Sequence, residues 1–522
     1  MEHVELVLFF LLVAVAGLTG LASLLRVPYP ILLVVGGSVL GFVPGSPEVV
    51  LEPDLVLLIF LPPLLFNAAY FASLRDLRRN LRPIVLTAVG LVLATMCAVA
   101  VVVHAIVPGV PWAAAFALGA IVSPTDPLAA VTIARRLGVP RALVAVIEGE
   151  SLVNDGTALV AYRTAVAAAV GGGFDLLDAT GDFVLNAAGG IAIGYLAARL
   201  LMWVFRRVDD DVLGVTISLC AGYAGYLPAE ELGLSGVLAA VTCGLVTGRH
   251  AHAISSAASR LRGSAFWEVL VFLLNAVLFV LVGLQLPRIL EAPSQSAGEL
   301  AVAGLAVSAT VIAMRLLWSH TTPYVVRALD RRPQQRLRRV GWRDRTVSAW
   351  SGLRGAVSLA AALALPVGFP ERDLLIFLTL AVIFATLVGQ GLTLPWLIRR
   401  LGIHDDGAGA REELIARKRA TEAALGRLEE LREADWSRDD TIDRVIGAYE
   451  FRRRRLAQRA GYDVDGDEDL EARSRAYQQL VREVLDSQRH EIVRLRDAGE
   501  ISDETLHVLE RELDLEDQRL EI

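Results

Sequence analysis

Apolar runs of about twenty residues recur from residue 4 to about residue 400 and then stop. A helix of about 20 apolar residues is long enough to cross the hydrocarbon core of a bilayer. Hydrophobic residues make up 54% of the chain, compared with roughly 45–50% in soluble domains. We therefore expect an all-α polytopic membrane protein, with a transmembrane domain at residues 1–400 and a soluble domain at residues 401–522.

Charge clusters and Gly/Pro turns divide the transmembrane domain into about thirteen candidate transmembrane helices. These candidates lie near residues 4–25, 29–44, 54–72, 83–107, 112–135, 141–170, 182–206, 211–228, 233–249, 264–287, 299–328, 346–366 and 372–399. Arginines follow the odd-numbered spans, whereas the loops after the even-numbered spans are acidic or nearly neutral. Because positively charged loops remain in the cytoplasm, we expect a multi-pass protein of the cytoplasmic membrane with its N-terminus outside.

The same topology places the C-terminal domain, residues 401–522, in the cytoplasm. This domain carries 21 basic and 32 acidic residues, a net charge of −11, which argues against nucleic acid or anionic lipid as its main partner. Residues 408–432 and 470–495 repeat Leu, Ile, Val and Ala at helical spacing, so we expect an α-helical cytoplasmic tail. A regulatory or dimer-contacting role and a merely solvated extension are equally compatible with this pattern.

The segment EGESLVNDG (148–156) places five polar side chains in one of the most apolar regions of the chain. Asp155 follows the preceding cytoplasmic arginine by 14 residues, so it lies about 21 Å along the helix, near mid-membrane. Ser151 and Asp155 are four residues apart, as are Glu150 and Asn154, so these four side chains share adjacent strips of one helix face. Intramembrane ionisable residues are usually functional; the alternative is a buried hydrogen-bond network that only holds helices together.

The preceding span contains the segment SPTDP, in which Pro124 and Pro127 flank Thr125 and Asp126. Each proline removes an intrahelical hydrogen bond, so we expect the helix to open at Thr125–Asp126. Unwound backbone at membrane depth is tolerated where it is buried or lines a cavity, and it is a recurrent way to build ion sites. A proline kink without a function is the simpler alternative.

A third polar feature is Arg354, which lies between two glycines in the twelfth span, in the segment GLRGAVSLA. A buried guanidinium requires a carboxylate partner, and Glu150 or Glu148 could supply it. If spans 1–6 and 8–13 form two inverted six-helix repeats, broken span 5 corresponds to glycine-interrupted span 12. Interruptions at corresponding places in two halves indicate a transporter's binding site, and we expect these two broken helices to cross.

SPTDP, EGESLVNDG and GLRGAVSLA, in this order, resemble the signatures of the sodium/proton exchanger branch of the monovalent cation/proton antiporters, in its NhaP-like bacterial form. FLPPLLFNAAY (60–70) and the apolar segment 266–286 are also similar to family segments. The resemblance covers essentially residues 1–400. One departure is Asn67, where many relatives have an acid, so the contribution of that position is open here.

The resemblance implies that Asp155 is the carboxylate that binds either a cation or a proton. It implies Asp126 as a second acid near the ion, and the hydroxyl of Ser151 and the main-chain carbonyl of Thr125 as oxygen ligands of the transported Na⁺. Asn154 would stabilise the helix crossing. A homodimer is implied in the same way, and no resident cofactor is implied beyond the transported Na⁺ and H⁺.

The resemblance also implies a structural ion pair between Glu150 and Arg354, which would tie span 6 to span 12. Carboxylate, hydroxyl and carbonyl oxygens are the ligands that a hard cation prefers. Because burial disfavours the charged form of an acid, Asp155 should hold a proton at moderate pH and exchange it for Na⁺. Asn154 cannot titrate, so we expect electroneutral exchange of one cation for one proton.

Other classes of membrane protein fit the sequence less well. An intramembrane aspartyl protease would carry a Gly-x-Gly-Asp motif, which is absent, so we do not expect an enzyme. A cation channel would need a continuous polar stripe rather than a titratable site at the midplane. An exchanger of Li⁺ or K⁺ for H⁺ could use the same residues, and the sequence does not decide the cation.

Overall fold

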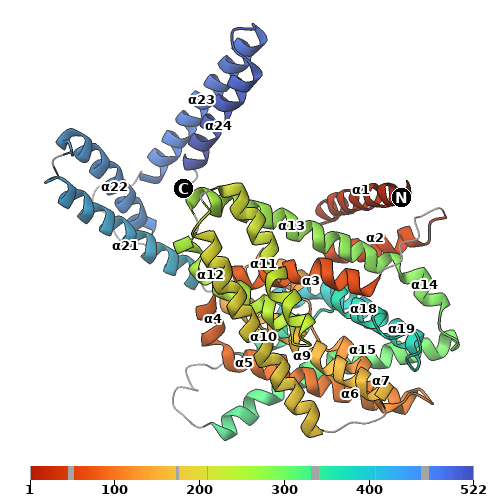
Figure 1. Ribbon diagram of the computed structural model, residues 1–522. Coiled ribbons are helices and arrows are strands. Elements are labelled where there is room, and N and C mark those ends of the chain that lie inside the picture. Colours follow the sequence, from red (N-terminus) through yellow and green to blue (C-terminus); the bar gives the residue numbers. More distant parts are fainter. Residues whose placement is uncertain are drawn as a thin grey trace. The chain divides into compact units, whose positions relative to one another are not determined.

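The computed structural model describes residues 2–44, 52–171, 176–208, 210–254, 256–330, 340–405, 407–434, 436–459 and 470–520. No β-strand occurs in these ranges, which form helices joined by short connections (Figure 1). The chain divides into two compact units, Met1–Asp405 and Asp406–Ile522.

Over the ranges that the structure describes, the first unit contains α-helices and two π-helical segments, η1 and η2. In its first half these are α1 (Glu2–Leu25), α2 (Tyr29–Gly41), α3 (Pro53–Phe71), α4 (Leu74–Arg79), α5 (Leu81–Val85), η1 (Leu86–Leu91), α6 (Val92–Ile106), α7 (Trp112–Val122), α8 (Pro127–Arg136) and α9 (Arg141–Gly171). In its second half these are α10 (Leu176–Phe205), α11 (Asp211–Glu231), α12 (Gly236–Ile254), α13 (Ala257–Leu284), α14 (Leu286–Glu291), α15 (Ala297–Leu329), α17 (Trp342–Trp350), α18 (Ala356–Leu363), α19 (Arg372–Ile383), η2 (Phe384–Gln390) and α20 (Gly391–Leu401).

Every segment that the hydropathy pattern predicts contains a helix, or consecutive helical pieces, in the described residues. Eight of them contain helices that are long and apolar enough to cross a membrane, judged by length and composition. Two further apolar helices, Tyr29–Gly41 and Leu55–Phe71, are shorter. The all-helical, multi-spanning architecture therefore agrees with the sequence.

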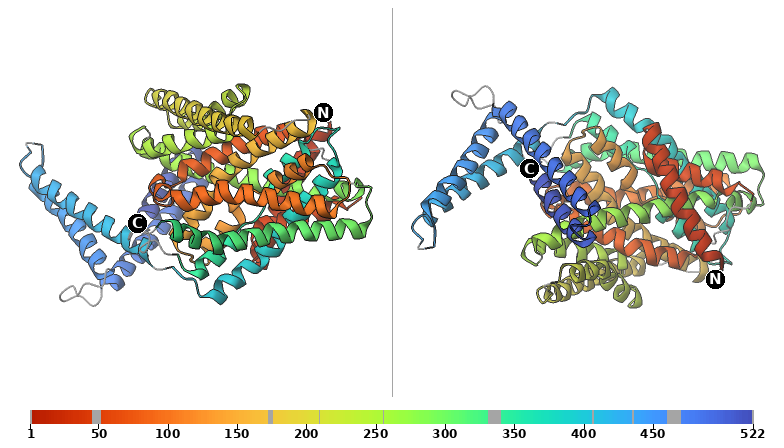
Figure 2. Two further views of the ribbon diagram at one scale, coloured as in Figure 1. Left: turned by 90° about the horizontal axis from the view of Figure 1, so that it is seen from below. Right: turned by 90° about the horizontal axis from the view of Figure 1, so that it is seen from above.

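Close helix packing in the first unit depends on small residues. Helices α2 and α13 pack along each other (Figures 1 and 2), and each contributes a glycine at the contact. A Cβ atom on Gly37 would lie 2.5 Å from the carbonyl oxygen of Val280, and one on Gly283 would lie 2.6 Å from the amide nitrogen of Ser38. Any side chain at either position would therefore push the two backbones apart, as is common where membrane helices approach closely.

Two predicted spans are broken in the middle. Helices α7 and α8 are separated by the non-helical residues 123–126, which include Pro124. Helices α17 and α18 are separated by residues 351–355, which include two glycines. Proline removes a helical hydrogen bond and glycine weakens the helix, so both breaks follow from the local sequence.

The spans near 83–107 and 372–399 are helical throughout, but each contains a π-helical segment. Such segments are rare and often lie at functional sites, because the wider turn changes which side chains face inward. Segment η2 places the hydroxyl of Thr386 where it accepts a hydrogen bond from the main-chain N–H of Arg354, at 3.1 Å.

In the described residues, the second unit forms four helices, α21 (Ala408–Leu431), α22 (Asp439–Arg459), α23 (Leu470–Asp497) and α24 (Asp503–Leu520). Helix α21 packs against α22, and α23 packs against α24, so the unit is built from two helical hairpins (Figure 1). Arg489 on α23 joins the second hairpin by hydrogen bonds to Asp514 (2.9 Å) and Asp517 (3.4 Å) on α24. The predicted helices at 408–432 and 470–495 coincide with α21 and α23.

Candidate functional site

The two breaks lie against each other. The main-chain N–H of Asp126 donates a hydrogen bond of 2.8 Å to the carbonyl oxygen of Leu353. In the other direction, Nε of Arg354 donates a hydrogen bond of 3.0 Å to the carbonyl oxygen of Val122. Each break therefore supplies a hydrogen-bond partner for a backbone group at the other break, which would otherwise be unpaired inside the protein.

The half-helix α7 ends at this crossing, and Arg354 binds its carboxyl end. The guanidinium donates to the carbonyl oxygens of Val122, Ser123 and Gly352, and its side chain is almost completely buried. The C-terminal end of a helix carries a partial negative charge and unpaired carbonyl groups. A buried arginine at this end stabilises the break, because its positive charge offsets the partial negative charge and its N–H groups donate hydrogen bonds to the carbonyl oxygens.

Asp126 occupies the opposite, positive end of a half-helix. Its Oδ1 accepts a hydrogen bond of 2.9 Å from the main-chain N–H of Leu128, so it caps the N-terminus of α8. Its carboxylate also touches Gly355, which directly precedes α18: a Cβ atom at Gly355 would lie 2.6 Å from the Cβ of Asp126. The carboxylate of Asp126 therefore lies beside the N-terminal ends of both α8 and α18.

Helix α9 presents the polar face of the segment EGESLVNDG to the break in α7–α8. The hydroxyl of Ser151 donates to the main-chain carbonyl of Thr125, and Nδ2 of Asn154 donates to Oγ1 of Thr125 at 2.9 Å. All three residues are buried. The structure thus brings Ser151, Asn154 and Thr125 together around one stretch of unwound backbone.

Asp155 lies one helical turn beyond Ser151 on the same face of α9. Within the described part of the chain, its carboxylate forms no hydrogen bond and no ion pair, and it is close enough to Asp126 for the two charges to interact. The side-chain oxygen of Asn154 is likewise buried without a hydrogen-bond partner there. The crossing therefore gathers carboxylate, hydroxyl, amide and carbonyl oxygens near a half-buried acid, a set that suits a hard cation.

The predicted ion pair between Glu150 and Arg354 is wrong. Glu150 instead pairs with Arg315 on α15, which donates to its two carboxylate oxygens at 2.5 and 3.1 Å. Both side chains are almost completely buried, with exposed fractions of 4% and 3% for Arg315 and Glu150. Arg354 does not need the carboxylate as a direct partner, because main-chain carbonyls accept its hydrogen bonds.

Arg315 is the buried residue of the crossing that the sequence reasoning missed. It also donates to the carbonyl oxygens of Ala349 (3.0 Å) and Ser348 (3.3 Å), at the carboxyl end of α17. The carboxyl ends of the two half-helices α7 and α17 therefore each lie at a buried arginine, Arg354 for α7 and Arg315 for α17. The signal was present in the sequence: an arginine in the middle of the apolar run 299–328 should be functional or paired, by the reasoning applied to Arg354.

The other polar residues of interest lie outside this arrangement. Glu148 forms an ion pair of 2.7 Å with Arg135, and both side chains are partly exposed. Asn67, on α3, has a buried side-chain oxygen with no hydrogen-bond partner among the described residues. In the described ranges, His, Cys, Asp and Glu side chains form no group of three or more that could hold a metal ion.

Comparisons with known proteins agree with the fold and the motifs. The family description "Sodium/hydrogen exchanger, transmembrane" matches residues 10–400. An uncharacterised Na⁺/H⁺ exchanger of Mycobacterium tuberculosis is 37% identical over 98% of this chain and 96% of its own length. The Na⁺/H⁺ antiporter ApNhaP of Aphanothece halophytica is 35% identical over 82% of this chain and 81% of its own length.

Among solved structures, the sodium proton antiporter MjNhaP1 of Methanocaldococcus jannaschii superposes with a TM-score of 0.58. The alignment covers 77% of this chain and 99% of that protein, at 19% sequence identity. At this level of identity the likeness concerns the fold alone.

Proposed function

Because this chain belongs to the sodium/hydrogen exchanger family, we propose that it exchanges Na⁺ or Li⁺ for H⁺ across the cytoplasmic membrane. The environment of Asp155 is the observation that supports this residue as the ion-binding site. Of the three acids in EGESLVNDG, Glu148 pairs at the surface and Glu150 pairs in the interior. Only Asp155 of these three has neither a hydrogen bond nor an ion pair in the part of the chain that the structure describes.

An unpaired carboxylate is costly inside a membrane protein. Asp155 therefore binds either a proton, which removes its charge, or a cation, which balances it. In the cation-bound state, Asp126, Ser151 and the carbonyl of Thr125 supply further oxygens. Because both ligands compete for one carboxylate, binding of Na⁺ releases H⁺, and this competition couples the two fluxes without a separate gate.

The stoichiometry in this proposal is one cation for one proton. Asn154 lies next to the exchanging acid but cannot titrate, and its Nδ2 is hydrogen-bonded to Thr125. Asp126 caps α8 and lies beside the N-terminus of α18, where partial positive charges favour its ionised form. Asp126 would thus keep its charge through the cycle while Asp155 changes its own, which makes the exchange electroneutral.

Transport by this site requires alternating access. We assign thirteen membrane spans in two inverted six-helix repeats, with the N-terminus outside and the acidic unit in the cytoplasm. The two broken helices and α9 form a core that would move against a scaffold containing α2, α3 and α10–α13. The scaffold would also form the contact of a homodimer. The second unit would regulate exchange from the cytoplasm and contribute to pH homeostasis.

The proposal can be tested in proteoliposomes that carry an imposed pH gradient and a pH-sensitive dye. Addition of Na⁺ or Li⁺ should dissipate the gradient with saturation, whereas Asp155→Asn should abolish the response. Glu148→Gln is the matched control, because it alters a surface acid on the same helix and should leave exchange unchanged. Full activity of Asp155→Asn would contradict the site assignment.

The same vesicles decide between the alternatives. A half-maximal K⁺ concentration below that of Na⁺ would identify a K⁺/H⁺ exchanger that uses the same site. Cation flux that continues without counter-movement of protons would identify a channel. A channel is not expected, because a channel does not require a titratable acid at a helix crossing.

A further inference from the structure

A cavity of about 790 Å³ lies away from the ion site, where the ends of several helices meet. Its lining comes from the C-terminal ends of α3, α10 and α12, from α4, and from the N-terminal parts of α11 and α13. Neither Asp155 nor Asp126 takes part in it. In the topology proposed above, these helix ends all lie at the cytoplasmic surface. The volume is within the range of about 300–1,000 Å³ that is common for ligand sites.

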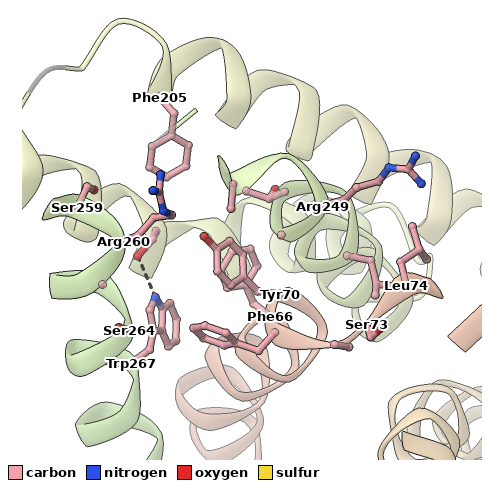
Figure 3. Close-up of a pocket in the computed structure, with 18 of the residues that line it drawn as sticks. Phe66, Tyr70, Ser73, Leu74, Phe205, Arg249, Ser259, Arg260, Ser264 and Trp267 are labelled. Carbon is pink, nitrogen blue, oxygen red and sulfur yellow. Dashed lines mark hydrogen bonds between the residues drawn. The ribbon is translucent and has the colours of Figure 1, made fainter. Parts of the chain in front are cut away.

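One side of the cavity is aromatic. Phe66 lies 5.7 Å from Trp267 and 5.7 Å from Tyr70, measured between ring centroids, so the three rings form one cluster. The indole N–H of Trp267 donates a hydrogen bond of 3.0 Å to the hydroxyl of Ser218, which fixes the plane of that ring (Figure 3). This side offers a preformed apolar surface. Tyr and Trp are typical of the level at which helices leave the hydrocarbon core.

The lining is also basic. Among apolar, small and hydroxyl-bearing residues it contains Arg75, Arg78, Arg249 and Arg260 and no acidic residue. Arg78 and Arg249 form no ion pair or hydrogen bond within the described ranges, and both are exposed. Figure 3 shows Arg249 and Arg260 on different helices and on opposite sides of the aromatic cluster. The acid at the start of α11, Asp211, already pairs with Arg262 at 3.5 Å and accepts a hydrogen bond from Ser256, so it does not neutralise this surface.

We propose that this cavity binds a phosphate-bearing anionic amphiphile. Its phosphate group would lie with the arginines, whose guanidinium groups match phosphate oxygens in charge and geometry. Its apolar chain would lie against Phe66, Tyr70 and Trp267. Basic pockets between helices at the cytoplasmic surface are suited to acidic lipid head groups. A soluble phosphorylated amphiphile would present the same chemistry.

The test uses the full-length protein, purified in detergent and stripped of lipid, with binding followed by native mass spectrometry and by thermal unfolding. Phosphatidylglycerol should bind and raise the unfolding temperature, whereas phosphatidylcholine with the same acyl chains should bind at least about tenfold more weakly, as loss of about 1.4 kcal/mol implies. Inorganic phosphate alone should not bind at matched concentration. Equal binding of the two lipids, or strong binding of inorganic phosphate, would overturn the proposal.

The variants localise the site. Arg78→Gln and Arg249→Gln should each weaken phosphatidylglycerol binding by about fivefold. Arg79→Gln is the matched control, because Arg79 is the exposed neighbour of Arg78 on α4 and does not line the cavity. Unchanged binding in both cavity variants would contradict the assignment. Asp155→Asn should bind the lipid normally, so a failure of the ion-site proposal is distinguishable from a failure of this one.

A cavity-filling variant tests the site without removing a charge, so that its effect on lipid binding is separate from any effect of charge removal on folding. A Cβ atom at Gly263 would meet only Cγ2 of Val215, at 3.9 Å, so Gly263→Phe can enter the cavity without a backbone clash. Phenylalanine is also a better helix former than glycine. The variant should unfold at the same or a higher temperature and lose lipid binding; retained binding would overturn the proposal.

A competition experiment determines whether the ligand is a membrane lipid or a soluble amphiphile. A single-chain lysophosphatidate, supplied below its micelle concentration, can be competed against phosphatidylglycerol. Preferential retention of phosphatidylglycerol supports a membrane lipid as the occupant. Preferential retention of the soluble amphiphile supports the same phosphate chemistry from the aqueous side.

Discussion

At the scale of single residues, the site depends on which polar groups are already satisfied. Ser151 and Asn154 both donate hydrogen bonds to Thr125, and the guanidinium of Arg354 donates to main-chain carbonyls. This leaves the carboxylate of Asp155 without a direct partner among the described residues. In the proposed mechanism, the chemistry of exchange is therefore concentrated on Asp155, while the neighbouring residues fix the geometry.

Asn154 is the residue on which the expected stoichiometry depends. Asn154→Asp would add a second titratable acid beside Asp155 without a large change in size. We expect this variant to move net charge in each cycle, because two acids can release two protons for one cation. Transport current in proteoliposomes on a solid-supported membrane measures this charge movement. The unmodified protein should give none, and a current from it that reverses with two-proton coupling would refute electroneutral exchange.

A substitution at Gly355 tests whether the position of Asp126 matters for cation binding. A methyl group at residue 355 would overlap the carboxylate of Asp126, so Gly355→Ala should displace that side chain. We expect the half-maximal Na⁺ concentration to rise by about tenfold, which corresponds to about 1.4 kcal/mol of binding free energy. Gly368→Ala is the control, because open space surrounds the glycine there. Equal Na⁺ dependence in the two variants would show that Asp126 is not needed near the ion.

At the scale of helices, buried arginines join elements that the sequence places far apart. Arg315 connects α15 to Glu150 on α9 and to the carboxyl end of α17. Arg354 connects the break before α18 to the carboxyl end of α7. The crossing is thus a joint between half-helices, held by charge at both of its negative ends.

The joint can be tested by removing one partner. Glu150→Gln or Arg315→Met should each lower the free energy of unfolding by about 3–5 kcal/mol, because the remaining charge stays buried and unpaired. The double variant Glu150→Leu/Arg315→Met should lose much less than the sum, since neither charge remains. Thermal unfolding in detergent provides the measurement.

The partly exposed ion pair between Glu148 and Arg135 provides the control for this series. Glu148→Gln should cost only about 0–1 kcal/mol, because its ion pair with Arg135 is solvated. Losses of equal size for Glu148→Gln and Glu150→Gln would contradict the structural importance of the buried pair.

The sequence predicts the elements of this joint better than its contacts. Pro124 and Pro127 locate the first break within two residues, because their effect on a helix is local. The partner of Glu150 was mispredicted, because it depends on how α9 and α15 are rotated about their own axes, which spacing along the chain does not define. The π-helical segments were also missed, since no residue type marks them. Helices α22 and α24 were not predicted individually.

At the scale of the whole molecule, the chain divides at Asp405–Asp406 into two units that are each compact. All residues of the helix crossing belong to the first unit. The second unit carries its own hairpins, with ion pairs such as Arg432–Asp443 at 2.7 Å. A division of this kind allows one part of a chain to act while the other modulates it.

Truncation after Asp405 tests this division of labour. We expect the shortened protein to exchange Na⁺ for H⁺ at the same half-maximal Na⁺ concentration, because every proposed ligand is retained. The dye assay in proteoliposomes provides the measurement, and Asp155→Asn in the truncated protein is the control. Loss of exchange by a truncated protein that remains monodisperse would show that the second unit is part of the transport machinery.

The contact between Gly355 and Asp126 also limits how this sequence can change over evolutionary time. Most positions in an apolar helix tolerate drift among Ala, Val, Leu and Ile. Here even one extra carbon atom would displace Asp126, which borders the proposed ion site. Descendants that keep the exchange activity should therefore retain glycine at residue 355 even after the surrounding lipid-facing residues have diverged beyond recognition.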